Sequence, residues 1–259
     1  MNLGDLLCEL RENILHDRSD QVAGSSDYFW DDKTLVRYIN EAERRFARRS
    51  RILRDNRTPE CCQITTVAGQ DNYQLHKSVI SVMSLQMAGD FADLARASHT
   101  ALNTYHQPDR YYFNPSQLAN LPPGKALAFD TDETMLENDH GSTSSINLRL
   151  YPVIASPYDN IVGTMRVIRL PMNRLSEDNL DAYPEIPEDH HLNMLDWAGY
   201  LALRSPDLDV AADGGLSRAG ALAKSFEQHV LDAKNEAERK MFQPALWGFG
   251  RNGFTWEGN

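Results

Sequence analysis

Residues Trp30–Arg57 read WDDKTLVRYINEAERRFARRSRILRDNR, and the architecture predicted for the rest of the chain depends on this segment. Asp31 is a favourable helix N-cap, because its carboxylate can accept the free backbone N–H groups of the first turn. Apolar side chains then recur every three or four residues on one helix face, at Leu35, Tyr38, Ile39, Ala42 and Phe46. An isolated helix of this kind is not stable in water, so its apolar face must pack against partners elsewhere in the chain.

The opposite face of the same helix is basic and carries Arg44, Arg45, Arg48 and Arg49 together with Glu41. Seven of the fourteen residues from Arg44 to Arg57 are arginine. Such a face can bind a phosphate backbone, or it can pair with the carboxylates of another protein. Because the chain carries a formal net charge of −11, we favour protein pairing and predict that these four arginines lie at a subunit interface, with DNA contact as the alternative.

Three further helices have the same period. Leu3, Leu6, Leu7, Leu10 and Ile14 predict a first helix. A second begins after Pro184–Pro187, with Glu188 and Asp189 in its early turn and an apolar stripe at Leu192, Leu195, Ala198 and Ala202. A third, long helix begins after Gly215. It carries a seam of largely small residues, which are Leu216, Ala219, Ala223, Phe226, Val230, Ala233 and Ala237. This seam either packs inside the chain's own bundle or meets another subunit, and we take Leu216, Ala219, Ala223, Phe226 and Val230 as candidate interface residues.

Between the helices, from about residue 59 to residue 172, the pattern becomes that of β-strands. Cys62–Val67 and Asn72–Leu75 surround a short loop with a glycine, which predicts a hairpin. Further predicted strands are Val79–Met87, Arg110–Phe113, Ala126–Phe129, Ile146–Tyr151 and Val162–Leu170. A short helix is predicted within Phe91–Leu102, and Asp130–Ser145 reads as an acidic loop.

These patterns predict an α+β protein. Its helical bundle is discontinuous, formed by residues 1–58 and 176–243, and an antiparallel β domain of residues 59–175 is inserted between them. The central expectation is that Leu35, Ile39 and Phe46 pack against residues that follow Pro184.

Residues 244–259 form an aromatic, glycine-rich tail without a clear period. Trp and Phe are effective interface anchors. The tail either folds back on its own domain or extends as a docking arm. We favour the extended arm, with Trp247, Phe249, Arg251, Phe254 and Trp256 as candidate docking residues.

Composition excludes several classes of protein. The three cysteines, Cys8, Cys61 and Cys62, do not form a disulfide framework, which indicates a reducing compartment. The first eighteen residues lack the features of a signal peptide, and no apolar run is long enough to span a bilayer. We therefore expect no membrane partner.

The strongest enzymatic motif is Ala126–Thr134, ALAFDTDET, which resembles the first motif of haloacid-dehalogenase-like phosphatases. In that magnesium-dependent chemistry the counterpart of Asp130 would attack phosphorus and that of Asp132 would act as the acid. That fold needs a parallel α/β sheet, which the flanking sequence does not predict, so the phosphatase is a remote alternative. His190 and His191 are adjacent and cannot share a helix face, and Cys61–Cys62 is not a zinc spacing. We expect no cofactor, no metal and no enzymatic activity.

The order of these motifs resembles that of phage head-to-tail adaptor (connector) proteins, including the tail tubular proteins of short-tailed phages. The resemblance spans about residues 28–242. It rests on Trp30–Leu35 with Tyr38–Ala42, Ile64–Leu75, Leu148–Pro152, Arg169–Pro171, Pro184–Ala198 and Ser205–Asp209.

The resemblance implies a structural virion protein in the neck, assembled in the host cytoplasm. Its copies would form a ring, usually a dodecamer, between the portal protein and the tail or nozzle protein. Double-stranded DNA would pass through without sequence recognition. Another phage tail or collar component is the alternative. The resemblance also implies that the β part meets the tail side and that the C-terminal segment reaches the portal.

Overall fold

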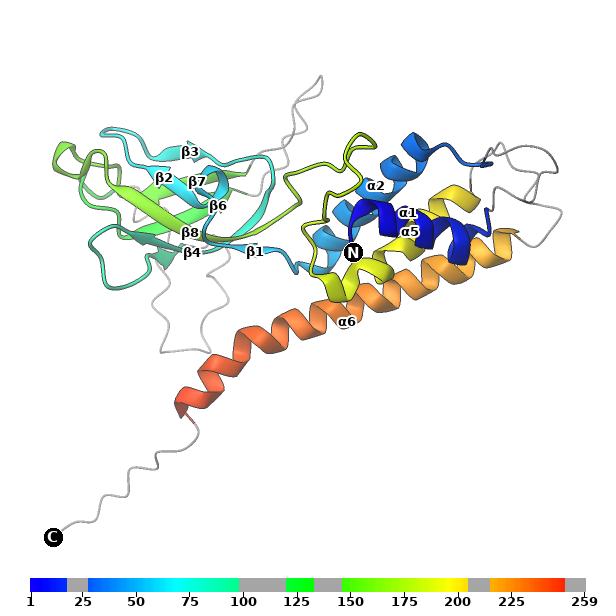
Figure 1. The fold of residues 1–259 in the computed structure, drawn as a ribbon. Coiled ribbons are helices and arrows are strands. Elements are labelled where there is room, and N and C mark those ends of the chain that lie inside the picture. Colours follow the sequence, from blue (N-terminus) through cyan, green and yellow to red (C-terminus); the bar gives the residue numbers. More distant parts are fainter. Residues whose placement is uncertain (18–27, 98–119, 133–145, 205–214, 250–259) are drawn as a thin grey trace, which may run out of the picture. The chain divides into compact units, whose positions relative to one another are not determined.

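The computed structural model describes residues 1–17, 28–97, 120–132, 146–204 and 215–249, without the side chains of residues 132, 215–216 and 241–249. The chain divides into two compact units. A helical unit combines Met1–Leu53 with Pro171–Asn259, and a β unit comprises Arg54–Leu170 (Figure 1). The polypeptide therefore leaves the helical unit, builds the β unit and returns.

The helical unit contains the four helical regions that the sequence predicts. These are α1 (Leu3–Glu9) continued by the π-helical η1 (Leu10–Leu15), α2 (Asp32–Ser50), η4 (Glu188–His190) continued by α5 (His191–Leu203), and α6 (Gly215–Phe249). Asp31 occupies the N-cap position of α2 as predicted, but its backbone carbonyl, not its side chain, accepts the first hydrogen bonds. Among the described ranges, no helix combines the length and apolar character needed to cross a bilayer.

One hydrophobic core joins the two ends of the chain. Leu35, Ile39 and Phe46 of α2 are completely buried in a cluster that also contains Leu195 of α5 and Phe226 of α6. The expected discontinuous helical bundle is thus confirmed. Burying apolar side chains from both ends in one cluster stabilises the unit through the hydrophobic effect.

The segment that returns from the β unit, residues 171–187, is held along α2 and α1 by hydrogen bonds. The Asn40 side chain bonds both backbone groups of Leu175, donating to its carbonyl and accepting from its N–H, each at 2.9 Å. The carboxylate of Glu43 accepts the Glu185 N–H at 2.7 Å. The N–H of Leu3 donates to the Ala182 carbonyl at 2.8 Å.

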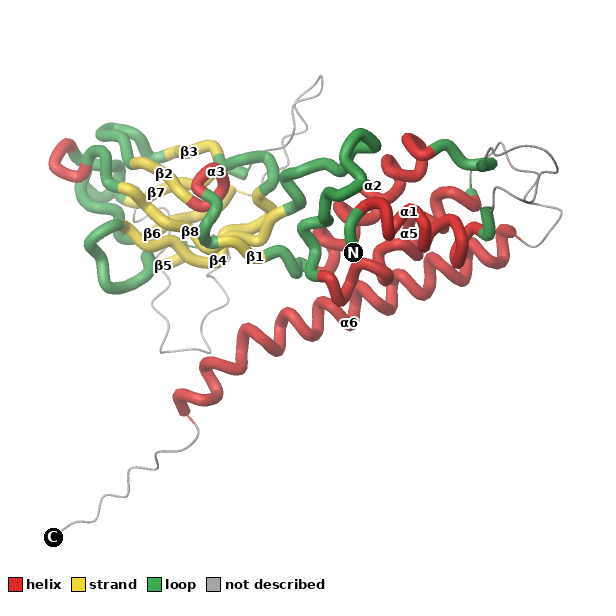
Figure 2. Tube along the Cα trace, in the orientation of Figure 1, coloured by secondary structure: helices red, strands yellow, loops and turns green. Residues whose placement is uncertain are grey.

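The β unit contains two four-stranded sheets (Figure 2). In the first, β8 (Val162–Arg169) pairs antiparallel with β1 (Arg54–Asp55), β2 (Gln63–Thr65) and β4 (Val79–Met87). In the second, the order is β3 (Asn72–Gln74), β7 (Asn147–Tyr151), β6 (Ala128–Asp132) and β5 (Ala95–Arg96). The described residues of this unit also form two short helices, α3 (Pro59–Cys62) and η3 (Ser156–Tyr158).

The predicted hairpin is wrong. The two runs do form strands, but β2 pairs with β8 and β3 pairs with β7, in different sheets. Gly69, with φ of 80°, lies in the connection and donates its N–H to the Ile154 carbonyl. The positive φ favours glycine and redirects the chain from one sheet to the other.

Two other expectations need correction, and a third concerns residues that the structure does not describe. The helix predicted within Phe91–Leu102 is replaced at Ala95–Arg96 by β5. β5 pairs parallel with β6, whereas the other described strand pairs are antiparallel. The predicted acidic loop begins as strand, because β6 continues through Asp132. The strand predicted at Arg110–Phe113 lies outside the described residues.

Candidate assembly surfaces

The four arginines of the predicted interface separate into two pairs. Arg45 and Arg49 face their own chain: the Arg45 guanidinium lies 3.7 Å from the centre of the Trp197 ring, and Arg49 forms an ion pair with Glu227 of α6. Arg44 and Arg48 are exposed, and neither forms an ion pair within the described residues. The prediction of a subunit contact therefore stands for Arg44 and Arg48, whereas Arg45 and Arg49 help to hold α2 against α5 and α6.

The seam on α6 faces inward. Ala219, Phe226 and Val230 are buried, and the last two belong to the core shared with α2 and α5. Ala223 is half-buried and packs against the same core, while the side chain of Leu216 lies outside the described residues. Of the two interpretations that the sequence leaves open, the bundle helix accounts for these contacts, because a side chain already packed inside its own chain has no surface left for another copy.

The predicted docking arm begins as helix. α6 continues through Phe249, so the backbones of Trp247 and Phe249 are helical and the extended arm cannot begin at residue 244. Arg251, Phe254 and Trp256 lie outside the described part of the chain. Their role at the portal stays a prediction.

A buried charge cluster that sequence reasoning missed joins η1 to the start of α2. Arg11 bonds Asp17 at 2.7 Å, with only 7% and 6% of their side chains exposed, and it also bonds Asp32 at 2.5 Å and the Trp30 carbonyl at 2.7 Å. Asp17 in turn accepts the backbone N–H of Phe29 and of Trp30. The only signal in the sequence is an arginine on the predicted first helix, and spacing alone does not show that it is buried.

One end of the β unit collects exposed apolar side chains. Val162 begins β8 at the end remote from β1, and Thr65 and Met87 end β2 and β4 there. Within the described part of the β unit, the large exposed apolar residues lie at this end or in the loop beside it, and they are Val67, Phe91, Leu121, Leu127 and Val162. Hydrogen bonds from Gly69 to Ile154 and from Ala155 to Gly124, and the Lys125–Asp90 ion pair, hold these loops together. We name this surface the β tip.

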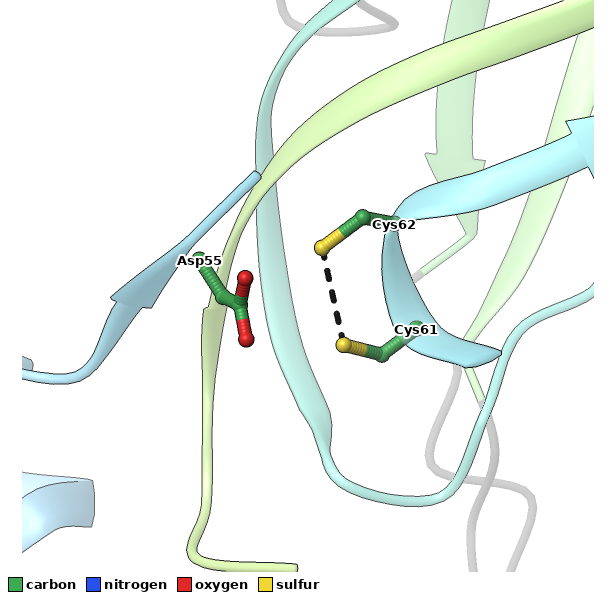
Figure 3. Close-up of side chains that lie close together, drawn as sticks. All are labelled: Asp55, Cys61 and Cys62. Carbon is green, nitrogen blue, oxygen red and sulfur yellow. Dashed lines mark hydrogen bonds between the residues drawn. The ribbon is translucent and has the colours of Figure 1, made fainter. Parts of the chain in front are cut away.

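Within the described residues, Asp55, Cys61 and Cys62 form a cluster of potential metal ligands, whose ligand atoms all lie within 4.8 Å of one another (Figure 3). The carboxylate of Asp55 is already used: it accepts hydrogen bonds from Arg169 Nε at 2.7 Å, Thr58 Oγ1 at 2.6 Å, and the backbone N–H groups of Arg57 and Thr58. Burial opposes its ionisation, but these hydrogen bonds outweigh that cost and hold the pKa of Asp55 well below its ordinary value.

The two thiols have the opposite electrostatics. Burial, reinforced by the adjacent Cys61 thiol, raises the pKa of Cys62 to about 12, and burial also raises the pKa of Cys61. A protonated thiol is a poor metal ligand and a poor nucleophile. Together with the saturated Asp55 carboxylate, this indicates a structural cluster that fastens β1 and α3 to β8.

The remaining candidate chemical groups serve packing or pairing. His190 is buried with its ring centre 5.4 Å from that of Phe46, and His191 Nε2 lies 2.8 Å from the Ile186 carbonyl, to which it donates. Asp130 lies within β6, opposite Arg149 of the antiparallel strand β7. The phosphatase motif requires its first aspartate to follow a strand of a parallel sheet, and this geometry does not provide that.

The comparison with family profiles agrees with the fold. The profile of the SU10 adaptor protein family matches residues 1–246. The chain therefore belongs to the SU10 adaptor protein family, a family of phage structural proteins. A comparison with curated proteins finds no match.

Proposed function

We propose that this protein is a head-to-tail adaptor of a phage virion, located in the neck, where copies form a ring between the portal and the tail. The observation that carries the proposal is the match to the SU10 adaptor protein family over residues 1–246. A ring arises when one heterologous contact repeats until the rotation closes. The exposed Arg44 and Arg48 on the helical unit support such a contact, because neither side chain forms an ion pair with any residue that the structure describes.

The β tip is the surface we assign to the tail-side partner, the tail or nozzle protein. Phe91 is fully exposed and Val67 and Val162 are substantially exposed, so all three can lose water on docking. Replacing Phe91 and Val67 by serine should reduce tail attachment to adaptor-bearing heads without unfolding the protein. Normal tail attachment by this variant would contradict the assignment.

The C-terminal segment is the part we assign to the portal. Among the described side chains of α6, the buried ones all precede Gln243, and they are Ala219, Phe226, Val230, Ala233 and Ala237. A chain truncated after Gln243 should therefore fold but bind portal-bearing heads more weakly. Full binding by the truncated chain would remove the portal role of residues 244–259.

The genome would pass through the ring without sequence recognition. A formal net charge of −11 supports this, because a mainly negative conduit repels DNA phosphates and lets the duplex slide. Electron microscopy of the purified protein, alone and with portal-bearing heads, tests the whole proposal. Rings in solution or at the portal are expected, whereas the absence of rings in both preparations would contradict the adaptor role.

A further inference from the structure

The outward face of α2 carries a stripe of exposed charged side chains. Its residues are spaced by four, four, three and four positions, which keeps them on one face. All five are exposed: Lys33, Arg37, Glu41, Arg44 and Arg48. Within the described residues none of the four cations forms an ion pair, in contrast to Arg49 at the edge of the stripe. We name this surface the basic stripe.

A second surface of the same helical unit has the opposite charge. Residues 176–183 are joined to the start of α1 by the hydrogen bonds from Leu3 to Ala182 and from Gly4 to Leu180, at 2.8 and 2.9 Å. Exposed or half-buried carboxylates line this surface, and they are Asp5, Glu9, Glu12, Glu177, Asp178 and Asp181. Arg174 is the one exposed Lys or Arg within residues 1–17 and 171–187. We name this surface the acidic surface.

The acidic surface also exposes apolar and aromatic side chains that could contribute to a contact. Leu180 is 49% exposed and Tyr183 is 66% exposed, and both lie among the carboxylates in sequence. Apolar and aromatic side chains at the centre of a contact contribute affinity, and surrounding charges set its register. The surface therefore has the composition of a protein-binding site rather than that of a merely solvated loop.

The basic stripe and the acid-bearing side of α1 both point away from the core that their helices share. The opposite side of α2 faces this core through Leu35, Ile39 and Phe46. The apolar side of α1 faces it through Leu3, Leu6 and Leu10. The stripe of one copy and α1 of that copy therefore lie on different sides of α2. A second copy can bring the two together, and each copy then offers one stripe and one acidic surface.

We infer that the basic stripe of one copy docks on the acidic surface of the next copy. This inference rests on the proposed ring and identifies the two surfaces that build it. The contact is heterologous, since different residues face each other across it, and its repetition closes a ring instead of ending at a dimer. Arg44 and Arg48 are the central cations, and Asp178 and Asp181 are their principal counter-charges.

Charge reversal in two matched variants tests the inference. Arg44→Glu/Arg48→Glu places acidic groups at the centre of both surfaces, and Asp178→Arg/Asp181→Arg places basic groups at the centre of both. Each variant alone should lower the fraction of protein in rings by at least about tenfold, because like charges then face each other. In an equal mixture, copies of the two variants can alternate with every contact complementary, so rings should return. The readout is electron microscopy and particle mass, with and without portal-bearing heads.

The control is Lys224→Glu/Arg239→Glu, which makes the same charge change on exposed cations of α6 and should leave rings intact. Circular dichroism verifies that each variant is folded. If the wild type forms rings and the Arg44/Arg48 variant forms them equally well, the inference is overturned, whereas the adaptor role is not. The inference is also overturned if both variants are folded and their equal mixture does not form rings. If the wild type itself forms no ring, alone or on heads, the adaptor role fails and the inference fails with it.

Discussion

Phe46 of α2 and Phe226 of α6 meet edge to face, with their ring centroids 5.9 Å apart. They come from the two ends of the chain that the β unit separates, and both are completely buried. Phe46 also contacts His190, so one ring joins the helical regions on either side of the insertion. This contact is the physical basis of the discontinuous unit.

Replacing Phe46 by alanine should therefore lower the free energy of unfolding of the helical unit by about 3–5 kcal/mol, through lost burial and a residual cavity. Chemical denaturation followed by circular dichroism measures this. The matched control is Phe91→Ala, at a fully exposed phenylalanine of the β unit, which should change stability by no more than about 0.5 kcal/mol. Equal effects of the two substitutions would contradict the shared core.

The second prediction contrasts a buried arginine with an exposed one. Arg11→Ala leaves Asp17 as a buried charge without its cation and should cost about 3–5 kcal/mol of stability. Arg49→Ala removes an ion pair whose side chains are both more than a third exposed and should cost about 1 kcal/mol or less. Denaturation midpoints of the two variants provide the comparison. A cost for Arg11→Ala as small as that for Arg49→Ala would show that the buried pair does not hold η1 to α2.

The third prediction concerns the cysteines. Cys8 is exposed, whereas Cys61 and Cys62 are buried thiols with raised pKa values. A maleimide or aromatic disulfide reagent at neutral pH should label Cys8 rapidly and the other two only after unfolding. A Cys8→Ser variant should therefore show almost no rapid labelling. Rapid reaction of the native Cys8→Ser protein would mean that the Asp55–Cys61–Cys62 cluster is open to solvent.

The fourth prediction is a pH dependence of stability due to His190. Burial lowers the pKa of His190 below its ordinary value of 6.5, although the carboxylate of Glu236 acts in the opposite direction. The unfolded chain therefore binds a proton before the folded chain does, so this contribution to stability is present above pH 6.5 and is lost as the pH falls below it. The slope for one group is at most about 1.4 kcal/mol per pH unit.

We would measure the unfolding free energies of the wild type and of His190→Gln between about pH 5 and pH 8, in steps of roughly half a pH unit. The difference between the two profiles separates the contribution of His190 from that of other groups. The wild type should lose more stability than the variant as the pH falls. Parallel pH profiles would show that His190 does not titrate differently in the folded and unfolded states.

Local periodicity was sufficient to locate the four helical regions of the helical unit. The side chains at Leu35, Ile39 and Phe46 repeat at the spacing of a helix, and this spacing is a property of neighbouring residues alone. The same applies to the alternation in Asn147–Tyr151, which predicted β7. Strand partners were harder to predict, because β2 pairs with β8 and β3 pairs with β7, and these partners are far apart in the sequence. A short loop with a glycine is compatible with a hairpin and equally with a change of sheet.

The candidate assembly surface shows the same division. Residue spacing alone shows that α2 has an apolar face and a basic face, and that apolar stripes near the C-terminus could cover the apolar face. Which arginines remain available follows from the packing of the helices: Arg45 contacts Trp197 and Arg49 pairs with Glu227, while Arg44 and Arg48 stay exposed. The packing is not visible in residue spacing. It also decided that Phe226 and Val230 belong to the chain's own core and that Arg11 and Asp17 form a buried pair. The physical reason is that helix periodicity is set by neighbouring residues, whereas burial and charge pairing depend on which distant segments pack together.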